Sequence, residues 1–164
     1  MKIWIIADTH FDHENIIKYC NRPFSTVEEM NECLISNWND IVSKEDLVWV
    51  LGDFTLSRNV LRIKYFLDRL NGTKKLIKGN HDTLSIAKYV EAGFAAVYDH
   101  PIIIGGFVIL SHEPIFVNEN TPYYNYYGHV HDDMNFLTET PRSRCVSVER
   151  TKYGPVRFIL NKKA

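Results

Sequence analysis

Three short apolar segments, each followed by polar residues, constrain the fold of this chain more than any other feature. They cover residues 2–7, 47–51 and 74–77. Apolar runs of this length are typical of strands that are buried on both faces of a sheet. Segments with helical spacing separate them, so the order strand, helix, strand, helix, strand, helix predicts parallel pairing in an α/β fold.

The helical spacing is clearest between residues 26 and 42. There the apolar residues recur on one face of a helix, at Val27, Met30, Leu34, Trp38 and Ile41. Ser25 followed by Glu28 resembles a capping box, which would start this helix. Apolar residues at the same spacing predict a second helix near residues 60–70, and a shorter one is expected over residues 84–92.

The pattern changes in the second half of the chain. Residues 95–98, 102–104 and 107–111 are closely spaced strand candidates, and Gly105-Gly106 is typical of a hairpin turn. Two more candidates follow, over residues 144–149 and 156–160. We therefore expect a mostly antiparallel second half. No linker or repeat separates the halves, which predicts a single domain over residues 1–164.

Polar residues able to bind metal ions follow an apolar run or a glycine at five places. These are Asp8-Thr9-His10, Gly52-Asp53, Gly79-Asn80-His81-Asp82, Ser111-His112 and Gly128-His129-Val130-His131. Five of the seven histidines lie in this set, so they are not scattered at random. Because α/β sheets build their sites at the carboxyl ends of strands, we expect these segments to converge.

The spacing within these segments has a chemical reason. Asp8 and His10 are two residues apart, so an extended backbone would project both to one side and onto one ion. Glycines at positions 52, 79 and 128 would let the backbone turn sharply before the next side chain. A carboxylate such as Asp53 can bridge two cations. Imidazole and carboxylate ligands together favour first-row divalent metals over calcium.

The ordered series of motifs resembles the calcineurin-like metallophosphoesterase family. Residues 9–24 also resemble its small bacterial and phage-type members. The resemblance implies a four-layer α/β sandwich, in which two mixed sheets pack face to face and are flanked by helices. It also implies a dinuclear metal centre with three groups of ligands: Asp8, His10 and His131 on one ion, Asp53 bridging, and Asn80, His112 and His129 on the other.

The same resemblance implies a metal-dependent phosphoric ester hydrolase, with a phosphodiesterase preferred to a phosphatase. Its nucleophile would be a hydroxide that bridges the two metals. Manganese is the expected metal, and iron, zinc, cobalt and nickel are alternatives. His81 would protonate the leaving oxygen or stabilise the transition state. Asp82 would either orient His81 or cap the following helix.

Three further features carry open alternatives. His13 would contact the substrate phosphate, or else face solvent in the first turn of a helix. Arg22 would clamp the phosphate, or else pack on Phe24 at the surface. The tyrosines at positions 123, 124, 126 and 127 would stack on a base or an aryl group, or else pack a loop against the sheet.

The charge balance limits the partners. A formal net charge of −1 gives no broad field for nucleic acid or an anionic membrane, so a small phosphate ester such as a nucleotide is the expected substrate. A nuclease acting on DNA or RNA ends is an alternative, and a non-catalytic interaction scaffold is another. Three cysteines without a CxxC pair, and no apolar stretch near the ~20 residues of a membrane span, predict a cytoplasmic protein.

Overall fold

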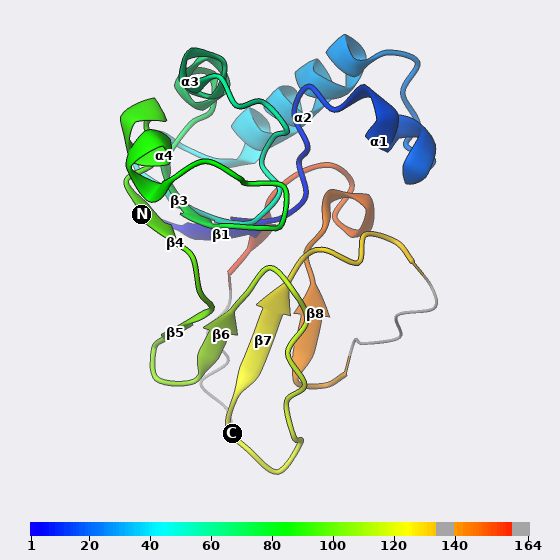
Figure 1. Ribbon diagram of the computed structural model, residues 1–164. Coiled ribbons are helices and arrows are strands. Elements are labelled where there is room, and N and C mark those ends of the chain that lie inside the picture. Colours follow the sequence, from blue (N-terminus) through cyan, green and yellow to red (C-terminus); the bar gives the residue numbers. More distant parts are fainter. Residues whose placement is uncertain (134–139, 159–164) are drawn as a thin grey trace.

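The computed structural model describes residues 1–133 and 140–158. Over these residues the chain forms two sheets that pack face to face, with α-helices beyond the first sheet (Figure 1). The predicted α/β sandwich of two mixed sheets with flanking helices is confirmed. Among the described residues, no helix combines the length and the apolar character needed to cross a membrane.

The first sheet has the strand order β4-β3-β2-β1-β9. Its strands are β1 (Ile3–Ile6), β2 (Leu47–Leu51), β3 (Thr73–Ile77), β4 (Ala96–Tyr98) and β9 (Val156–Arg157). β1 to β4 are parallel, as the alternation of apolar runs and helices predicted, and β9 is antiparallel to β1. The carboxyl ends of β1, β2 and β3 therefore lie along one edge.

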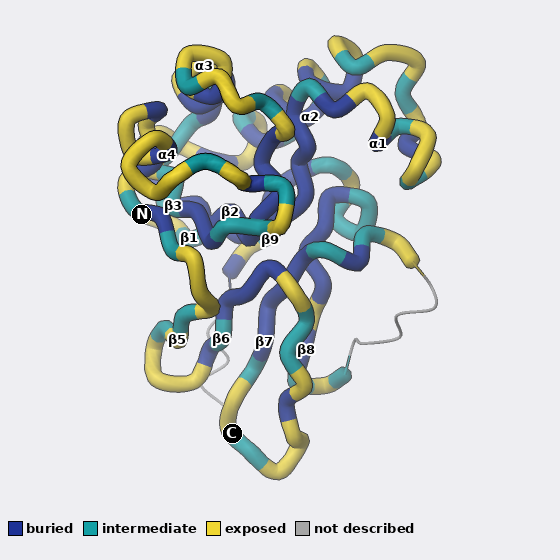
Figure 2. Tube along the Cα trace, viewed as in Figure 1, coloured by how far each residue is buried: buried dark blue, intermediate teal, exposed yellow. Residues whose placement is uncertain are grey.

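Both faces of this sheet are buried because its apolar residues alternate between two cores. Ile6, Val50 and Leu76 face the helices, whereas Ile5 and Leu51 face the second sheet. Figure 2 shows these central strands among the buried parts of the molecule. An apolar run without polar alternation is what such a doubly covered strand requires.

The helices covering this sheet are α1 (Glu14–Tyr19), α2 (Val27–Ile41), α3 (Val60–Arg69) and α4 (Ile86–Ala92). Thr26 caps the N-terminus of α2, and its side chain accepts a hydrogen bond from the N–H of Glu29. Glu29 in turn accepts from the N–H of Ser25 at 2.7 Å. The capping box is thus one residue later than the Ser25–Glu28 pair that the sequence suggested.

The second sheet has the order β5-β6-β7-β8. Its strands are β5 (Ile102–Ile104), β6 (Val108–Leu110), β7 (Tyr124–Tyr127) and β8 (Ser143–Cys145). The prediction of a mostly antiparallel second half is wrong, because β6 is parallel to β7 and β7 to β8. The hairpin of β5 and β6 is antiparallel, as expected. Long connections return the chain to the same end of the sheet before β7 and before β8.

The tyrosine-rich segment explains part of this error. Residues 124–127 form the inner strand β7, in which Tyr126 is 5% exposed and Tyr127 is fully buried. Tyr124 and Tyr126 pack in the core between the two sheets. The expected strand over residues 144–149 ends early, at Cys145, and a 3-10 helix η1 (Val148–Arg150) follows. Between them the backbone of Ser147 pairs with Ala7 in an isolated bridge.

Candidate metal centre

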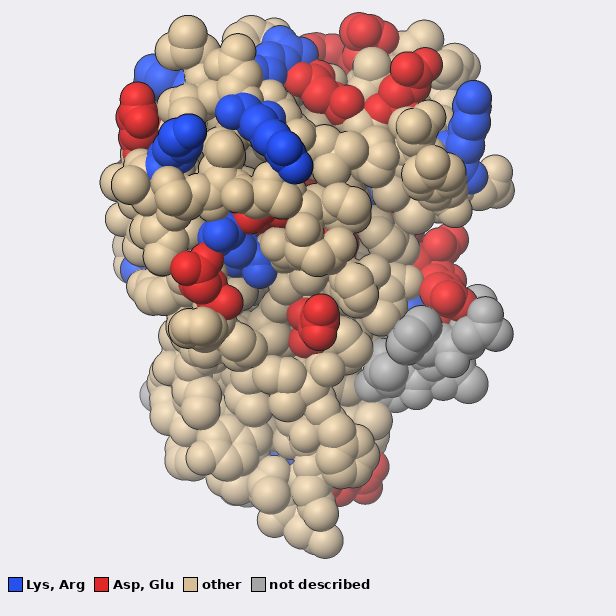
Figure 3. Space-filling view, viewed as in Figure 1, with Lys and Arg blue, Asp and Glu red and all other residues tan. Residues whose placement is uncertain are grey.

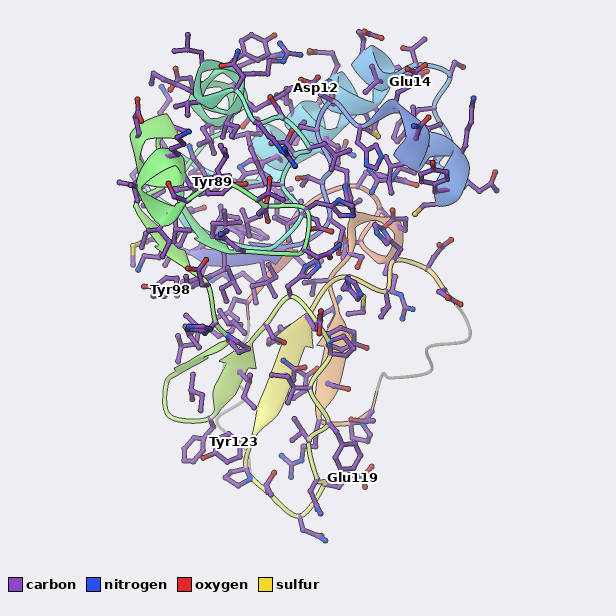
Figure 4. The ribbon with its side chains drawn as sticks, in the orientation of Figure 1. Asp12, Glu14, Tyr89, Tyr98, Glu119 and Tyr123 are labelled. Atoms are coloured by element: carbon purple, nitrogen blue, oxygen red, sulfur yellow. The ribbon has the colours of Figure 1, made fainter. Side chains whose placement is uncertain are left out.

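The loops that carry the predicted ligands meet between the two sheets. Asp8, Asp53 and Asn80 follow β1, β2 and β3, whereas His112 follows β6 and His129 follows β7. Figure 4 shows these loops converging near the middle of the molecule, while Tyr123 and Glu119 lie at the far end of the second sheet. Tyr123 packs against Phe107, and its ring is remote from the converging loops.

The side chains form two groups of potential metal ligands. Asp8, His10 and His131 make one group, and Asp53, His112 and His129 make the other; within each group the ligand atoms lie within 4.8 Å of one another. Asp53 joins the groups, because its Oδ2 lies 3.5 Å from Nε2 of His10 and 3.5 Å from Nε2 of His112.

Asn80 completes the second group. Its Oδ1 lies 2.9 Å from His112 Nε2 and 3.1 Å from His129 Nδ1. The structure thus brings all seven predicted ligands together, from five separate segments of the chain.

The donor set fits divalent transition-metal ions. Nε2 of His10 is buried and has no hydrogen-bond partner among the described residues, which is costly for a polar atom unless something binds it. His112 Nε2 and His129 Nδ1 lie only 3.1 Å apart, an arrangement in which two ring nitrogens point at a common position. Convergent imidazoles with carboxylates and an amide oxygen are typical of zinc, manganese or iron sites.

The backbone of the site is strained. Five non-glycine site residues have a left-handed φ: Asp8 (59°), His10 (51°), Asp53 (53°), His129 (69°) and His131 (50°). The extended backbone predicted for Asp8 and His10 is therefore wrong. Hydrogen bonds from their N–H groups to Gly52 and Asp53 carbonyls hold this loop in its conformation instead. Strain of ~1–3 kcal/mol per residue that is concentrated at one place is typical of functional sites.

Gly79 and Gly128 allow neighbouring ligand loops to pack closely against each other. A Cβ on Gly79 would overlap a carboxylate oxygen of Asp53. A Cβ on Gly128 would lie 2.5 Å from the Asp8 carboxylate and 2.5 Å from the Ala7 side chain. Contacts this short are excluded, so any larger residue would push the ligand loops apart.

Asp82 lies beneath the Asp53 loop. Its carboxylate accepts hydrogen bonds from the N–H groups of Asp53 (2.7 Å), Gly79 (2.9 Å) and Phe54 (3.2 Å). Among the described hydrogen bonds, none joins Asp82 to the ring of His81, which it was predicted to orient. Asp82 therefore connects the loop of Asp53 to the loop of Gly79 and Asn80 through backbone hydrogen bonds. Burial raises the pKa of its carboxyl to about 7.

His81 and His13 both flank His10. The His81 ring is 5.3 Å from the His10 ring, and its side of the site is only partly buried. His13 is 8% exposed, and its Nδ1 lies 3.2 Å from Nδ1 of His10. His81 is therefore partly exposed beside His10, whereas His13 is buried and contacts the His10 ring.

Arg22 lies under the ligand loop and not at the surface. Its side chain is 0% exposed, and its guanidinium donates hydrogen bonds to the carbonyls of Asp8 (2.8 Å) and Thr9 (3.0 Å). It also forms an ion pair with Glu149 at 2.7 Å. This placement differs from both alternatives considered for the residue, because a phosphate clamp would require these contacts to be broken and a surface arginine would be exposed.

Two residues that the sequence did not single out contact the ligands. Ser147 donates a hydrogen bond to Asp8 Oδ2 at 2.6 Å, and Glu149 Oε1 lies 2.9 Å from His131 Nδ1. They belong to no recognisable metal motif. The one available signal is that both follow an apolar segment, as the other site residues do.

Burial and neighbouring charges shift the pKa values of three predicted ligands in different directions. Burial lowers the pKa of His10 well below its usual value, and the charges of His131 and Arg22 add to this effect, so the imidazole is neutral. Burial raises the pKa of Asp8 to about 6, opposed by His131 and His112. Burial alone would lower the pKa of His131, but its contacts with Cys20 and Glu149 raise it.

A cavity of about 260 Å³ adjoins His112. Ile77, Pro101, Pro114 and Ile115 form its apolar wall, and the rest of its lining is polar. Its rim carries Lys78, which is ion-paired with Asp99 at 2.9 Å. The cavity therefore offers an apolar wall beside the second group of ligands, and a rim that also carries the carboxylate of Glu113.

Comparisons with known proteins agree with this geometry. The family model described as calcineurin-like phosphoesterase matches residues 1–154. Uncharacterized protein MJ1445 of Methanocaldococcus jannaschii is 42% identical over 169 residues, covering 97% of this chain and 88% of that protein. The gene 66 protein of Mycobacterium phage L5 is 34% identical over 82 residues, 48% of this chain and 39% of the phage protein.

Two solved structures are similar. The protein of unknown function AQ665 from Aquifex aeolicus superposes with a TM-score of 0.72 at 26% identity, over 94% of both chains. The nuclease MPE of Pseudomonas putida has a TM-score of 0.53 at 22% identity, over 79% of this chain and 61% of its own; this is a likeness of fold alone.

Proposed function

The chain belongs to the calcineurin-like phosphoesterase family, and we propose that it is a phosphodiesterase that works with two divalent metal ions, manganese first among them. The observation that supports this most is the placing of Asp53 between two ligand groups, 3.5 Å from a histidine nitrogen of each. When bound, the two ions would activate water and offset the negative charge that develops on the phosphate.

Each ligand then has an assigned place. Asp8, His10 and His131 would hold one ion, and Asn80, His112 and His129 would hold the other, with Asp53 shared between them. The unpartnered Nε2 of His10 and the close ring nitrogens of His112 and His129 support this assignment. Asp82 keeps the Asp53 loop in place through the three backbone N–H groups that it accepts from.

His81 protonates the leaving oxygen in this proposal. Its ring lies at the edge of the first ligand group, and its backbone N–H donates to Asp53 Oδ1 at 2.9 Å, which couples its position to the shared carboxylate. A general acid must reach the leaving oxygen, and partial exposure beside the ligands allows that. His13 supports the His10 ring and presents its remaining edge to the phosphate.

The cavity beside His112 favours a diester over a monoester. A diester carries two organic groups, and the cavity can take the second one. Because Lys78 is paired with Asp99, the rim offers little free positive charge to another phosphate, so an uncharged group such as a nucleoside fits best.

The surface charge does not favour a nuclease. A DNA or RNA chain needs a continuous cationic approach surface. Over the described residues of the face in Figure 3, positive and negative side chains are interspersed, and few charges lie over the second sheet. With the net charge of −1, this supports a small substrate. The non-catalytic scaffold is also less favoured, since the chain retains His81 and all seven ligands.

The test is a substrate screen with manganese-loaded protein and elemental analysis of the sample. We expect hydrolysis of bis(p-nitrophenyl) phosphate to exceed that of p-nitrophenyl phosphate, and Asp53→Asn to abolish both. Turnover that survives exhaustive chelation, or survives Asp53→Asn, would contradict the proposal. Degradation of short oligonucleotides in preference to small diesters would instead identify a nuclease.

A further inference from the structure

We propose that Glu149 is a positioning residue for His131, and that it supports only one of the two metal sites. The inference rests on the proposed function, because it takes the ligands of that site to be Asp8, His10 and His131. It concerns a residue that belongs to none of the metal-binding segments in the sequence.

The contact between the two side chains is buried. Glu149 Oε1 lies 2.9 Å from Nδ1 of His131, and the Glu149 side chain is 3% exposed. A histidine that binds a metal through one ring nitrogen usually donates the N–H of the other to a carboxylate or carbonyl, which sets the tautomer and the ring orientation. With Nδ1 engaged by Glu149, Nε2 is the nitrogen left for the ion.

Arg22 extends this support to the other ligands of the same site. Its guanidinium lies 2.7 Å from Glu149 Oε1 and donates to the carbonyls of Asp8 and Thr9. Arg22 and Glu149 are 127 positions apart in the chain. Their ion pair therefore connects the loop of Asp8 to the ring of His131. Its two members neutralise each other in a buried place, where a lone charge would be costly.

The second ligand group is held by other atoms. His112 Nδ1 lies 2.9 Å from the carbonyl of Leu51, and Asp82 braces the loop of Asp53. Among the described contacts, Glu149 reaches no ligand of that group. Loss of Glu149 should therefore weaken the binding of one ion and leave the binding of the other unchanged.

A third metal site is a weaker explanation of Glu149. Cys20, His131 and Glu149 also lie close enough together to hold an ion. However, Arg22 already places a cation 2.7 Å from Oε1 of Glu149, and a second positive charge beside this carboxylate would be repelled. Glu149 is thus better placed to orient His131 than to bind metal.

The experiment titrates metal-free protein with Mn²⁺ by isothermal calorimetry. Wild type should bind two ions. In Glu149→Gln one dissociation constant should rise ~10–100-fold while the other is unchanged, since partners of ligand histidines have effects of that size. Glu119→Gln, an exposed carboxylate at the far end of the second sheet, is the matched control and should change neither constant. Thermal unfolding of the metal-free proteins separates this effect from a loss of folding.

Unchanged constants in Glu149→Gln, or an equal rise in both, would overturn the inference. Imidazole ¹⁵N spectra of metal-free wild type give a second measurement, independent of whether the variant folds: we expect a proton on Nδ1 of His131 that is hydrogen-bonded to Glu149, and an unprotonated Nδ1 would also overturn the inference. Failure of the proposed function is distinguishable, since wild type would then bind no pair of ions or hydrolyse no ester, whatever the spectra show.

Discussion

The carboxylate of Asp82 accepts a hydrogen bond from the backbone N–H of Asp53, 2.7 Å away. One acid thus braces the backbone of another, and the braced residue is the one that lies between the two ligand groups. Because the same carboxylate also accepts a hydrogen bond from the N–H of Gly79, it connects the loops after β2 and β3.

Asp82→Asn should loosen this arrangement. An amide can present only one acceptor oxygen to three N–H donors, so at least one buried donor loses its partner, at ~1–3 kcal/mol. We expect a lower melting temperature and weaker binding of Mn²⁺, measured by calorimetry. The exposed Asp40→Asn on α2 is the control and should leave both unchanged. Normal stability in Asp82→Asn would show that the brace is dispensable.

Gly79→Ala should displace the shared carboxylate. The added Cβ would overlap an oxygen of Asp53, whose backbone is itself held by Asp82. We expect the binding of both ions to weaken and turnover to fall by at least tenfold. Gly154→Ala is a suitable control, because its Cβ would meet Asn37 at an ordinary 3.4 Å. Two tightly bound ions in Gly79→Ala would refute the steric argument.

His81→Ala should retain both ions yet lose most turnover, by ~10²–10⁴-fold. The loss should depend on the leaving group, because a general acid matters most when the leaving oxygen is basic. We therefore expect a large loss with an alkyl phosphodiester and a smaller one with bis(p-nitrophenyl) phosphate. Equal losses with both esters, at full metal occupancy, would argue against proton donation by His81.

Ile115→Trp should fill the cavity beside His112. If that cavity takes the second organic group of a diester, the KM for bis(p-nitrophenyl) phosphate should rise several-fold, while p-nitrophenyl phosphate is little affected. Phe116→Trp is the neighbouring control, since Phe116 is 88% exposed. A KM that rises equally for both esters would place the second group elsewhere.

Asp46→Asn should change the acid limit of stability. Asp46 accepts hydrogen bonds from the Trp4 indole and from the N–H groups of Lys2 and Ser43, which lower its pKa to about 2. A lowered pKa in the folded state stabilises the protein above the unfolded value, near 4, and this stabilisation is lost as pH falls from about 4 to about 2.

The variant should therefore melt at a lower temperature at neutral pH, and its stability should fall less steeply between pH 4 and pH 2. Circular dichroism across this range measures both effects. Asp68→Asn removes half of the exposed Lys64–Asp68 pair and should have little influence. A pH dependence that matches wild type would show that Asp46 has no such role.

Much of the first sheet could be predicted from the sequence, because buried strands and amphipathic helices leave local patterns. The strand Leu47–Leu51 was predicted to the residue, and the helix Val27–Ile41 to within one residue at each end. The second sheet was harder. Its inner strand, Tyr124–Tyr127, is short and aromatic, and such a segment also suits a loop that packs on a sheet.

The sequence by itself determined which residues would gather, since each polar segment follows a strand or a glycine and the carboxyl ends of parallel strands share an edge. Only the tertiary structure decided which partners the supporting charges take. Arg22 binds Glu149 and Asp82 binds the Asp53 backbone because the folded chain brings these groups together in its buried interior. A buried charge must pair with whatever lies beside it, and that neighbour is set by packing over distances that no local pattern records.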